Sequence, residues 1–338
     1  MCRISSERYA EEFAVSGRRT FLSAVIVSLA APSLVRAQTA RVYRVGIVSA
    51  GGPYEHTVDG LRDGLKELGL EEGKQYVFHR RDTQGDLRAA EAAAKSLEQE
   101  KVDLIFAVPT TVAIAAKRAT TGVPIVFIIG SDPVAQGLVS SFAKPGGRIT
   151  GVFSFRTELN AKRLEILKEI APSMRKVAIF YNPNNAIAMI GLKSTREAAQ
   201  RLGLVLIERE VRSGDELRAS LHALKAGEAD ALFPVSDATV QSHVSMLIEE
   251  SRTRMLPAIF NDDSLVAAGG LASYGASYYD MARLAAKYVN RVLNGANPAD
   301  LPVERSERFV LFLNARTARD IGITIPQSLL LRADEVIQ

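Results

Sequence analysis

Residues 44–49, RVGIVS, decide how this chain is organised, because residues 176–181, KVAIFY, repeat the pattern 132 positions later. Three further pairs follow in the same order, at offsets of 134, 127 and 133 positions: 68–70 with 202–204, 102–106 with 229–233, and 123–127 with 256–260. Four landmarks at nearly one offset predict two halves of one topology. Two unrelated α/β domains with similar element lengths would imitate part of this pattern.

Short apolar runs alternate with longer amphipathic stretches in each half. The short runs are β-branched or aromatic and apolar on both faces, which is typical of parallel strands between helices: 45–48, 104–108, 125–129, 177–180 and 257–260. The longer stretches space their apolar residues at three and four, as amphipathic helices do: 61–68, 88–99, 161–170, 194–202 and 216–224. The capping-box spacing of Ser213 and Glu216 marks one helix start. This alternation predicts an α/β fold with a doubly wound parallel sheet in each half.

The first 37 residues resemble an export signal. Arg18 and Arg19 precede an uncharged run from Thr20 to Ser33, and the small-residue site Val35-Arg36-Ala37 follows. The run is too short to span a bilayer, which needs roughly 20 apolar residues. We therefore expect residues 1–37 to be a twin-arginine type export signal that is cleaved after Ala37. The alternative is an amphipathic N-terminal tail.

The composition of the chain after Ala37 excludes several kinds of site and function. The single cysteine is Cys2, so a chain cut after Ala37 has neither a disulfide nor a thiolate metal site. It keeps 37 basic and 35 acidic side chains out of 42 and 38, a net charge near +2 that gives no footprint for nucleic acid. About 300 residues are enough for two domains with their own cores.

Loops of small and hydrogen-bonding residues follow the predicted strands. The first strand of each half leads into 49–53 and 181–185, and the later strands lead into 109–111, 130–132, 234–237 and 261–263. Ligands of open parallel sheets bind beyond the carboxyl ends of the strands. The repeat therefore predicts a small-molecule site in a cleft between the two halves.

Several segments together resemble the ABC-transporter substrate-binding family that includes bacterial tryptophan and tyrosine receptors. They follow one another in order over nearly all of the chain after the expected cleavage site: RVGIVSAGG (44–52), DGLRDGLKELGL (59–70), VPTTVAIAAKRATTGVPIVFIIGSDPVAQGLV (108–139), KPGGRITGV (144–152), ELNAKRLEILKEI (158–170), YNPNN (181–185), GGLASYGASYYDMARLAAKYVNRVLNGANPADLPVE (269–304) and NARTARDIGITIPQSLLLRADEVI (314–337).

The resemblance implies a type I periplasmic-binding-protein fold, in which two Rossmann-like lobes are joined by a three-segment hinge. The expected first lobe is 41–152 with 273–305, and the second is 153–272 with 306–338. The hinge segments would be 149–155, 270–275 and 307–314. Such a protein closes on a small molecule and delivers it to an ABC permease in the inner membrane. We expect a periplasmic monomer.

The expected ligand is an amino acid or a related small carboxylate. Aromatic amino acids are the first candidates. Thr110 and Thr111 open a predicted helix whose N–H groups can hold a carboxylate. Asp237 follows the equivalent strand of the second half and can hold an ammonium group. Either side chain could instead be a helix cap. The full set of candidates is Ser49, Gly51, Thr110, Thr111, Asp132, Tyr181, Asn182, Asp237, Asp262 and Tyr278. A place in a core is the alternative for each tyrosine.

Enzyme signatures are absent from the sequence. It has no nucleophile elbow and no phosphate-binding loop, and its four histidines stand apart from one another. We therefore expect no catalytic residue, no metal site and no cofactor. Two alternatives stay open: a ligand-loaded sensor subunit that docks on a membrane receptor, and a periplasmic hydrolase built from distant residues.

Overall fold

The computed structural model describes residues 41–155 and 159–338, and the apolar run at 45–48 belongs to the strand next to one edge of a six-stranded sheet within them. Its strand order is β11-β5-β4-β3-β1-β2, and every pairing in it is parallel. The strands are β1 (Tyr43–Ser49), β2 (Tyr76–Asp82), β3 (Leu104–Val108), β4 (Ile125–Ile129), β5 (Ile149–Phe153) and β11 (Glu304–Arg305). We call this sheet and the helices that cover it the first lobe.

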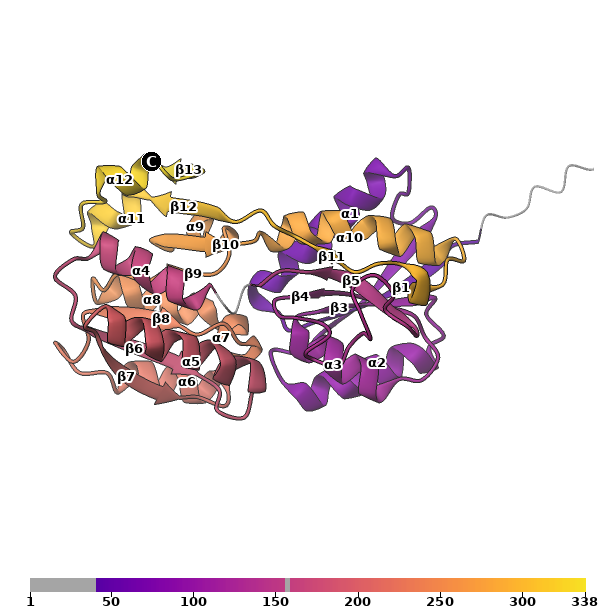
Figure 1. The fold of residues 1–338 in the computed structure, drawn as a ribbon, viewed down its shortest axis with the longest axis horizontal. Coiled ribbons are helices and arrows are strands. Elements are labelled where there is room, and N and C mark those ends of the chain that lie inside the picture. Colours follow the sequence, from indigo (N-terminus) through magenta and orange to yellow (C-terminus); the bar gives the residue numbers. More distant parts are fainter. Residues whose placement is uncertain (1–40, 156–158) are drawn as a thin grey trace, which may run out of the picture. The chain divides into compact units, whose positions relative to one another are not determined.

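Helices cover both faces of this sheet. In Figure 1 the pair α1 and α10 lies on one face, and the pair α2 and α3 lies on the other. The helical elements of the first lobe are η1 (Gly52–Glu55), α1 (His56–Glu67), α2 (Leu87–Gln99), α3 (Thr110–Ala119), α10 (Tyr278–Leu293) and η2 (Pro298–Asp300). Because β3 and β4 are buried along their whole length, the sheet has no solvated face at its centre.

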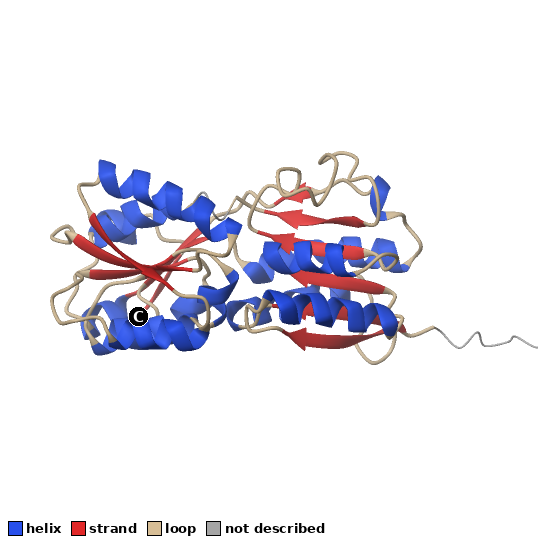
Figure 2. Cartoon of the chain, turned by 90° about the horizontal axis from the view of Figure 1, so that it is seen from below, coloured by secondary structure: helices blue, strands red, loops and turns tan. Residues whose placement is uncertain are grey.

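The second lobe repeats this plan. Its strands are β6 (Lys176–Tyr181), β7 (Val205–Glu210), β8 (Ala231–Pro234), β9 (Ile259–Phe260), β10 (Ala272–Gly275), β12 (Val310–Asn314) and β13 (Glu335–Ile337). Its helices are α4 (Asn160–Ile170), α5 (Ala186–Arg201), α6 (Gly214–His222), α7 (Ala238–Ser242), α8 (Val244–Thr253), α9 (Ser264–Ala267), α11 (Ala315–Asp320) and α12 (Gln327–Leu330). Figure 2 shows the helices flanking the strands in both lobes.

Strand order confirms the internal repeat. The sheets β7-β6-β8 and β9-β10-β12-β13 meet at a bridge between Leu232 and Ala258, so the second lobe reads β7-β6-β8-β9-β10. This matches β2-β1-β3-β4-β5 of the first lobe. One pairing departs from the expected parallel arrangement: β12 runs antiparallel to β10, because the chain enters it on returning from the first lobe.

Alternate residues of β6 separate the two cores of the second lobe. Val177 and Ile179 pack with α4 and α5, whereas Ala178 and Phe180 pack with α6 and α8. A strand points successive side chains to opposite faces, so a continuous apolar run fills both cores.

The runs predicted as strands overlap β1, β3, β4, β6 and β9, and the stretches predicted as helices overlap α1, α2, α4, α5 and α6.

The chain passes between the sheets at three places: after β5, between β10 and α10, and between β11 and β12. Part of the first passage, like the predicted export signal, lies outside the described residues. Two expected lobe boundaries need a correction. Phe153, the expected start of the second lobe, is the last residue of β5 in the first-lobe sheet, and residues 273–275 belong to β10 and pair with the second-lobe strand β12. The described residues nevertheless fall within a single structural unit.

Two glycines let α1 and α10 approach closely. A Cβ on Gly60 would lie 2.2 Å from the carbonyl oxygen of Tyr279, and one on Gly64 would lie 2.6 Å from the Cβ of Ala286. Residues four apart share one face of a helix, so Gly60 and Gly64 form a flat strip against α10.

We predict that Gly60→Ala destabilises the protein despite the higher helix propensity of alanine. Forcing a methyl group onto backbone atoms costs about 1–3 kcal/mol, whereas the propensity gain is about 1 kcal/mol. Denaturant unfolding should show a lower midpoint. Lys66→Ala, on the exposed face of the same helix, is the control and should change stability by less than about 0.5 kcal/mol. Equal midpoints for the two variants would contradict the close packing.

Candidate functional site

A pocket lies where the strand ends of the two lobes meet. The first lobe and α10 contribute Tyr54, Pro109, Thr110, Thr111, Gly130 and Tyr278. The second lobe contributes Asn185, Ile187, Ser236, Asp237, Ala238 and Asn261. Four of the predicted residues therefore share one pocket: Thr110, Thr111, Asp237 and Tyr278.

The first-lobe wall presents the N-terminus of α3. Pro109 is the N-cap residue of this helix, and no side chain caps it. Thr110 does not act as a cap, because its Oγ1 lies 3.1 Å from Ser131 Oγ and accepts the N–H of Gly130 at 3.2 Å. The Oγ1 atom of Thr111 is buried and has no hydrogen-bond partner. The first N–H groups of a helix have no intrahelical acceptor, so this wall offers donors to an anion.

The second-lobe wall presents the carboxylate of Asp237, which is 3% exposed. Asp237 is the N-cap of α7, and its Oδ1 accepts the N–H of Val240 at 2.9 Å. Its Oδ2 accepts the N–H of Asn182 at 3.1 Å. Burial raises the pKa of Asp237 to about 6, because desolvation outweighs the hydrogen bonds from backbone N–H groups that favour the charged form. Asp237 is thus both a cap and a poorly solvated carboxylate in the pocket wall.

Asn182 supports this carboxylate. Besides donating its backbone N–H to Asp237, it donates from Nδ2 to Thr239 Oγ1 at 2.9 Å, and its Oδ1 accepts the N–H of Asn184 at 3.0 Å. These bonds tie the end of β6 to the start of α7. Asn182 therefore positions Asp237 and is not itself in the pocket wall.

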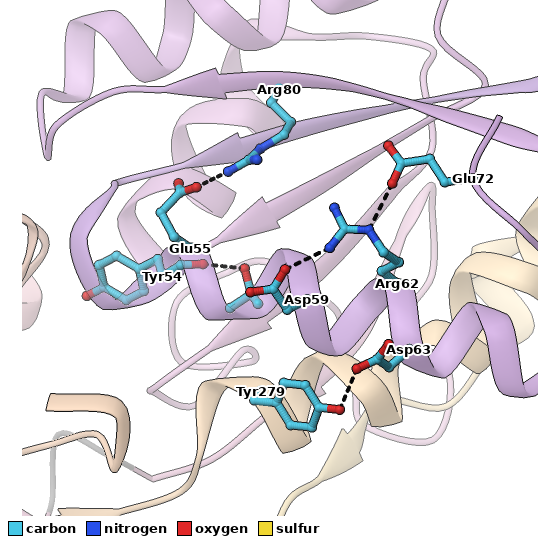
Figure 3. Close-up of polar contacts among 9 residues, drawn as sticks. Tyr54, Glu55, Asp59, Arg62, Asp63, Glu72, Arg80 and Tyr279 are labelled. Carbon is cyan, nitrogen blue, oxygen red and sulfur yellow. Dashed lines mark hydrogen bonds and ion pairs between the residues drawn. The ribbon is translucent and has the colours of Figure 1, made fainter. Parts of the chain in front are cut away.

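Two tyrosines form the aromatic part of the wall. The rings of Tyr54 and Tyr278 are 4.8 Å apart at an angle of 60°. Tyr54 lies on η1, and Figure 3 shows how the next residue, Glu55, pairs with Arg80 of β2. Glu55 also accepts a hydrogen bond of 3.0 Å from Ser49 Oγ. The predicted ligand residue Ser49 thus helps to hold η1 and does not line the pocket.

A neighbouring open cavity shares Thr111, Asn185 and Ile187 with the pocket. It has a volume of about 180 Å³, and its walls include the apolar side chains of Leu87 and Ile114. The three shared residues form a common wall, so the two spaces are adjacent.

The remaining predicted residues lie elsewhere. A Cβ on Gly51 would meet the Asp82 carboxylate at 2.6 Å, so Gly51 packs inside the first lobe. Asp132 accepts the N–H groups of Val134 and Ala135, which closes its own loop. Tyr181 is in the core of the second lobe and donates to Glu208 at 3.0 Å, and burial raises the pKa of its hydroxyl.

Asp262 holds the start of α10. It accepts the N–H of Tyr278 at 3.0 Å and the N–H of Ser264 at 3.2 Å, and it is 2% exposed. It lines a separate cavity between α9 and α10, so the structure does not bring it together with Asp237.

Sequence reasoning missed several residues of the wall. Ser236 is the second residue after β8 and Asn261 is the first after β9, in loops that the strand-end rule had indicated. Tyr54 lies one residue beyond the loop expected after β1. Asn185 is the N-cap of α5, accepting the N–H of Ile187, and it lines the pocket as well.

In the described part of the chain, no three or more His, Cys, Asp or Glu side chains gather in a way that would suit a metal ion. Between residues 41 and 338, leaving aside 156–158, no helix has the length and apolarity needed to cross a bilayer.

Known proteins share both the sequence pattern and the fold. A tyrosine-binding protein from Clostridioides difficile strain R20291 is 26% identical over 264 residues, which are 78% of this chain and 76% of the relative. An ABC domain from Streptococcus pneumonia, solved in complex with L-Trp, is 25% identical with a TM-score of 0.77. The match covers 88% of this chain and 100% of that one.

A third match differs in its degree of structural similarity. The ligand-free, open structure of a substrate-binding protein with adhesive properties from Clostridium difficile is 26% identical over the same shares, 88% and 100%, with a TM-score of 0.57. At nearly equal identity, the described chain is therefore more similar in arrangement to the L-Trp complex.

The family model described as ABC transporter substrate binding protein matches residues 45–337. This match spans both lobes and all the residues of the pocket wall. The chain belongs to the family of ABC transporter substrate-binding proteins.

Proposed function

We propose that this protein is the extracytoplasmic solute-binding component of an ABC importer. Its proposed ligand is an amino acid or a related small carboxylate, and aromatic amino acids are the first candidates. Asp237 would hold the α-ammonium group. The start of α3 and Thr111 Oγ1 would hold the α-carboxylate, and Tyr54 and Tyr278 would contact the ligand. The side chain would extend past Ile187 into the neighbouring cavity.

The observation that carries this proposal is the buried carboxylate of Asp237. An ionised group without solvent is costly unless a partner compensates it, and three backbone N–H groups leave the pKa of Asp237 well above its usual range. A strongly perturbed group in a pocket is typical of a functional site. An ammonium group would supply the missing charge, while the uncapped end of α3 favours an anion on the opposite wall. A zwitterion satisfies both walls.

The relatives support the same ligand class. One carries the name tyrosine-binding protein, and another was solved with L-Trp. The apolar walls at Leu87, Ile114 and Ile187 suit a large apolar side chain. A ligand held by both lobes binds the closed arrangement more tightly than the open one, so it shifts the population towards closure.

The lobes are the moving parts in this proposal. We assign residues 41–153 and 276–305 to the first lobe and 159–275 and 306–338 to the second, with the three passages between the sheets as the hinge. The closed monomer would deliver its ligand to a permease in the inner membrane. A sensor that docks on a membrane receptor would use the same closed form.

The first prediction from this proposal concerns the charge on Asp237. Wild-type protein should bind one or more of the twenty amino acids in a calorimeter, with L-tyrosine and L-tryptophan tested first. Asp237→Asn should weaken binding by about 2 kcal/mol or more, roughly thirtyfold in Kd, because the ammonium group loses its buried partner. Asparagine is also a good N-cap, so the melting temperature should change little.

Two companion variants sharpen this test. Thr111→Ala should weaken binding by about 1 kcal/mol, since the N–H groups of α3 remain. Asp132→Asn makes the same chemical change at a loop carboxylate outside the pocket and should bind like wild type. Wild-type affinity in Asp237→Asn would reduce Asp237 to a cap and remove the chemical basis for an amino-acid ligand.

A second prediction follows from the raised pKa. The ammonium group needs an ionised Asp237, so affinity should be constant above pH 7 and fall as the pH drops below about 6. The loss approaches a factor of about ten per pH unit once the free protein is mostly protonated. Titrations between pH 4.5 and pH 8 would measure it. Asp237→Asn should lack this dependence, and an unchanged slope in that variant would assign the effect to another group.

A third prediction tests the export proposal, which rests on Arg18, Arg19 and the site at Ala37. In fractionated cells the mature protein should begin at Gln38. Replacing both arginines with lysine should leave full-length precursor inside the cell, because the twin-arginine signal is read by a receptor. N-terminal sequencing decides the question: a mature protein that still begins at Met1 would show that residues 1–37 are not a cleaved signal.

A further inference from the structure

Two turns of the first lobe contact α7 of the second. Gly52 follows β1 and Gly85 follows β2, so both turns lie at the carboxyl edge of the six-stranded sheet. A Cβ on Gly52 would lie 2.7 Å from the carbonyl oxygen of Gln241 and 2.9 Å from the Cα of Ser242. A Cβ on Gly85 would lie 2.9 Å from the carbonyl oxygen of Ala238 and 2.9 Å from the Cα of Thr239. Real Cβ atoms do not approach backbone so closely, so only glycine permits these contacts.

The contact places the pocket carboxylate. Ala238 is 3% exposed and packs with the core of the first lobe, although it belongs to the second. It directly follows Asp237, the N-cap of the same short helix. When α7 lies against the two turns, Asp237 is held across the pocket from the start of α3. The backbone of the turns and the position of the carboxylate are therefore coupled.

Backbone conformation alone does not explain both glycines. Gly52 has φ 60° and Gly85 has φ 75°, in the left-handed region. In this chain Gln84, Lys101 and Met255 adopt φ between 47° and 57°, so that region is also open to residues with a side chain. Other left-handed glycines, Gly73 and Gly203 among them, have no atom within 4 Å of an added Cβ. Gly52 and Gly85 differ from those glycines because backbone atoms of the other lobe lie within 3 Å of an added Cβ.

We propose that Gly52 and Gly85 are affinity-determining residues that act by allowing α7 to dock on the first lobe, so that their missing side chains set the population of the closed, ligand-binding arrangement. This inference rests on the proposed function, because it assigns the regulation of the same site. A methyl group at either position blocks docking without touching the ligand. The open arrangement, in which the lobes separate at this contact, accommodates the methyl group.

The test compares each variant with a glycine of similar φ and free surroundings. Gly85→Ala (φ 75°) is matched by Gly73→Ala (φ 84°), and Gly52→Ala (φ 60°) is matched by Gly203→Ala (φ 64°). All four add the same methyl group in a left-handed turn, and only the first of each pair meets α7. Calorimetry measures the Kd for L-tryptophan or L-tyrosine, whichever wild type binds more tightly. Small-angle scattering at one sub-saturating ligand concentration, the same for each variant and its control, measures compactness.

We expect Gly85→Ala and Gly52→Ala to bind about tenfold or more weaker than their controls, because apparent affinity falls in proportion to the population of the competent arrangement. Scattering should show them less compact than the controls at equal ligand concentration. Their melting temperatures without ligand should match those of the controls. If the glycines acted only in folding, the melting temperatures of these variants would be lower than those of the controls.

Two results overturn the proposal. Control-like affinity in both variants would show that α7 docks without the glycines. A melting temperature well below that of the control in the absence of ligand would show that the contact is permanent rather than specific to closure. The wild-type titration separates these results from a failure of the proposed function: wild type that binds no amino acid refutes both, whereas wild-type binding with unaffected variants refutes only this inference.

Discussion

The burial of both faces of the parallel sheets is the constraint on which the rest of this structure depends. Strands such as β3 and β4 are apolar on both sides, so helices must cover both faces. Solvent and ligand then reach the sheet only at its ends. In a parallel sheet every strand ends at the same edge, and each strand leads into a turn or helix start there. The pocket walls, η1, α3 and α7 all follow from this arrangement.

Asp237 shows how the same constraint creates a site at some cost to stability. With a pKa of about 6 against an ordinary 3.8, its ionised form is disfavoured in the folded protein by about 3 kcal/mol. The folded pKa is raised, so this penalty is present above pH 6 and disappears as the pH falls below the unfolded value near 4. A cationic partner relieves the penalty only when it is bound. A residue that weakens this buried arrangement without a ligand thus favours it once a cation is bound.

The fold and the edge of the sheet where the pocket lies could be predicted from the sequence, because apolar periodicity and strand ends are local features. The sequence was insufficient for choosing among similar side chains in those loops. Asp132, Asp237 and Asp262 all accept backbone N–H groups, and only Asp237 is in the wall of this pocket. Tyr181 ends β6, but strand alternation turns its ring into the core. The role that we propose for Gly85 depends on a helix that begins 153 residues later in the chain, which no local pattern reveals.

The internal repeat also explains how one topology supplies two opposite walls. At the 127-residue offset of β3 and β8, Asp237 falls on Thr110, so the two walls are equivalent positions of one plan. In the first lobe the helix start has no side-chain cap and keeps its positive end available. In the second lobe the cap is a carboxylate, which neutralises that end and adds a negative charge beside it. The two equivalent helix starts therefore differ in charge: the first lobe presents an uncapped positive end, and the second presents a carboxylate. Under the proposed function, a ligand with both charges would fit between the walls in one orientation, with its side chain directed towards Ile187.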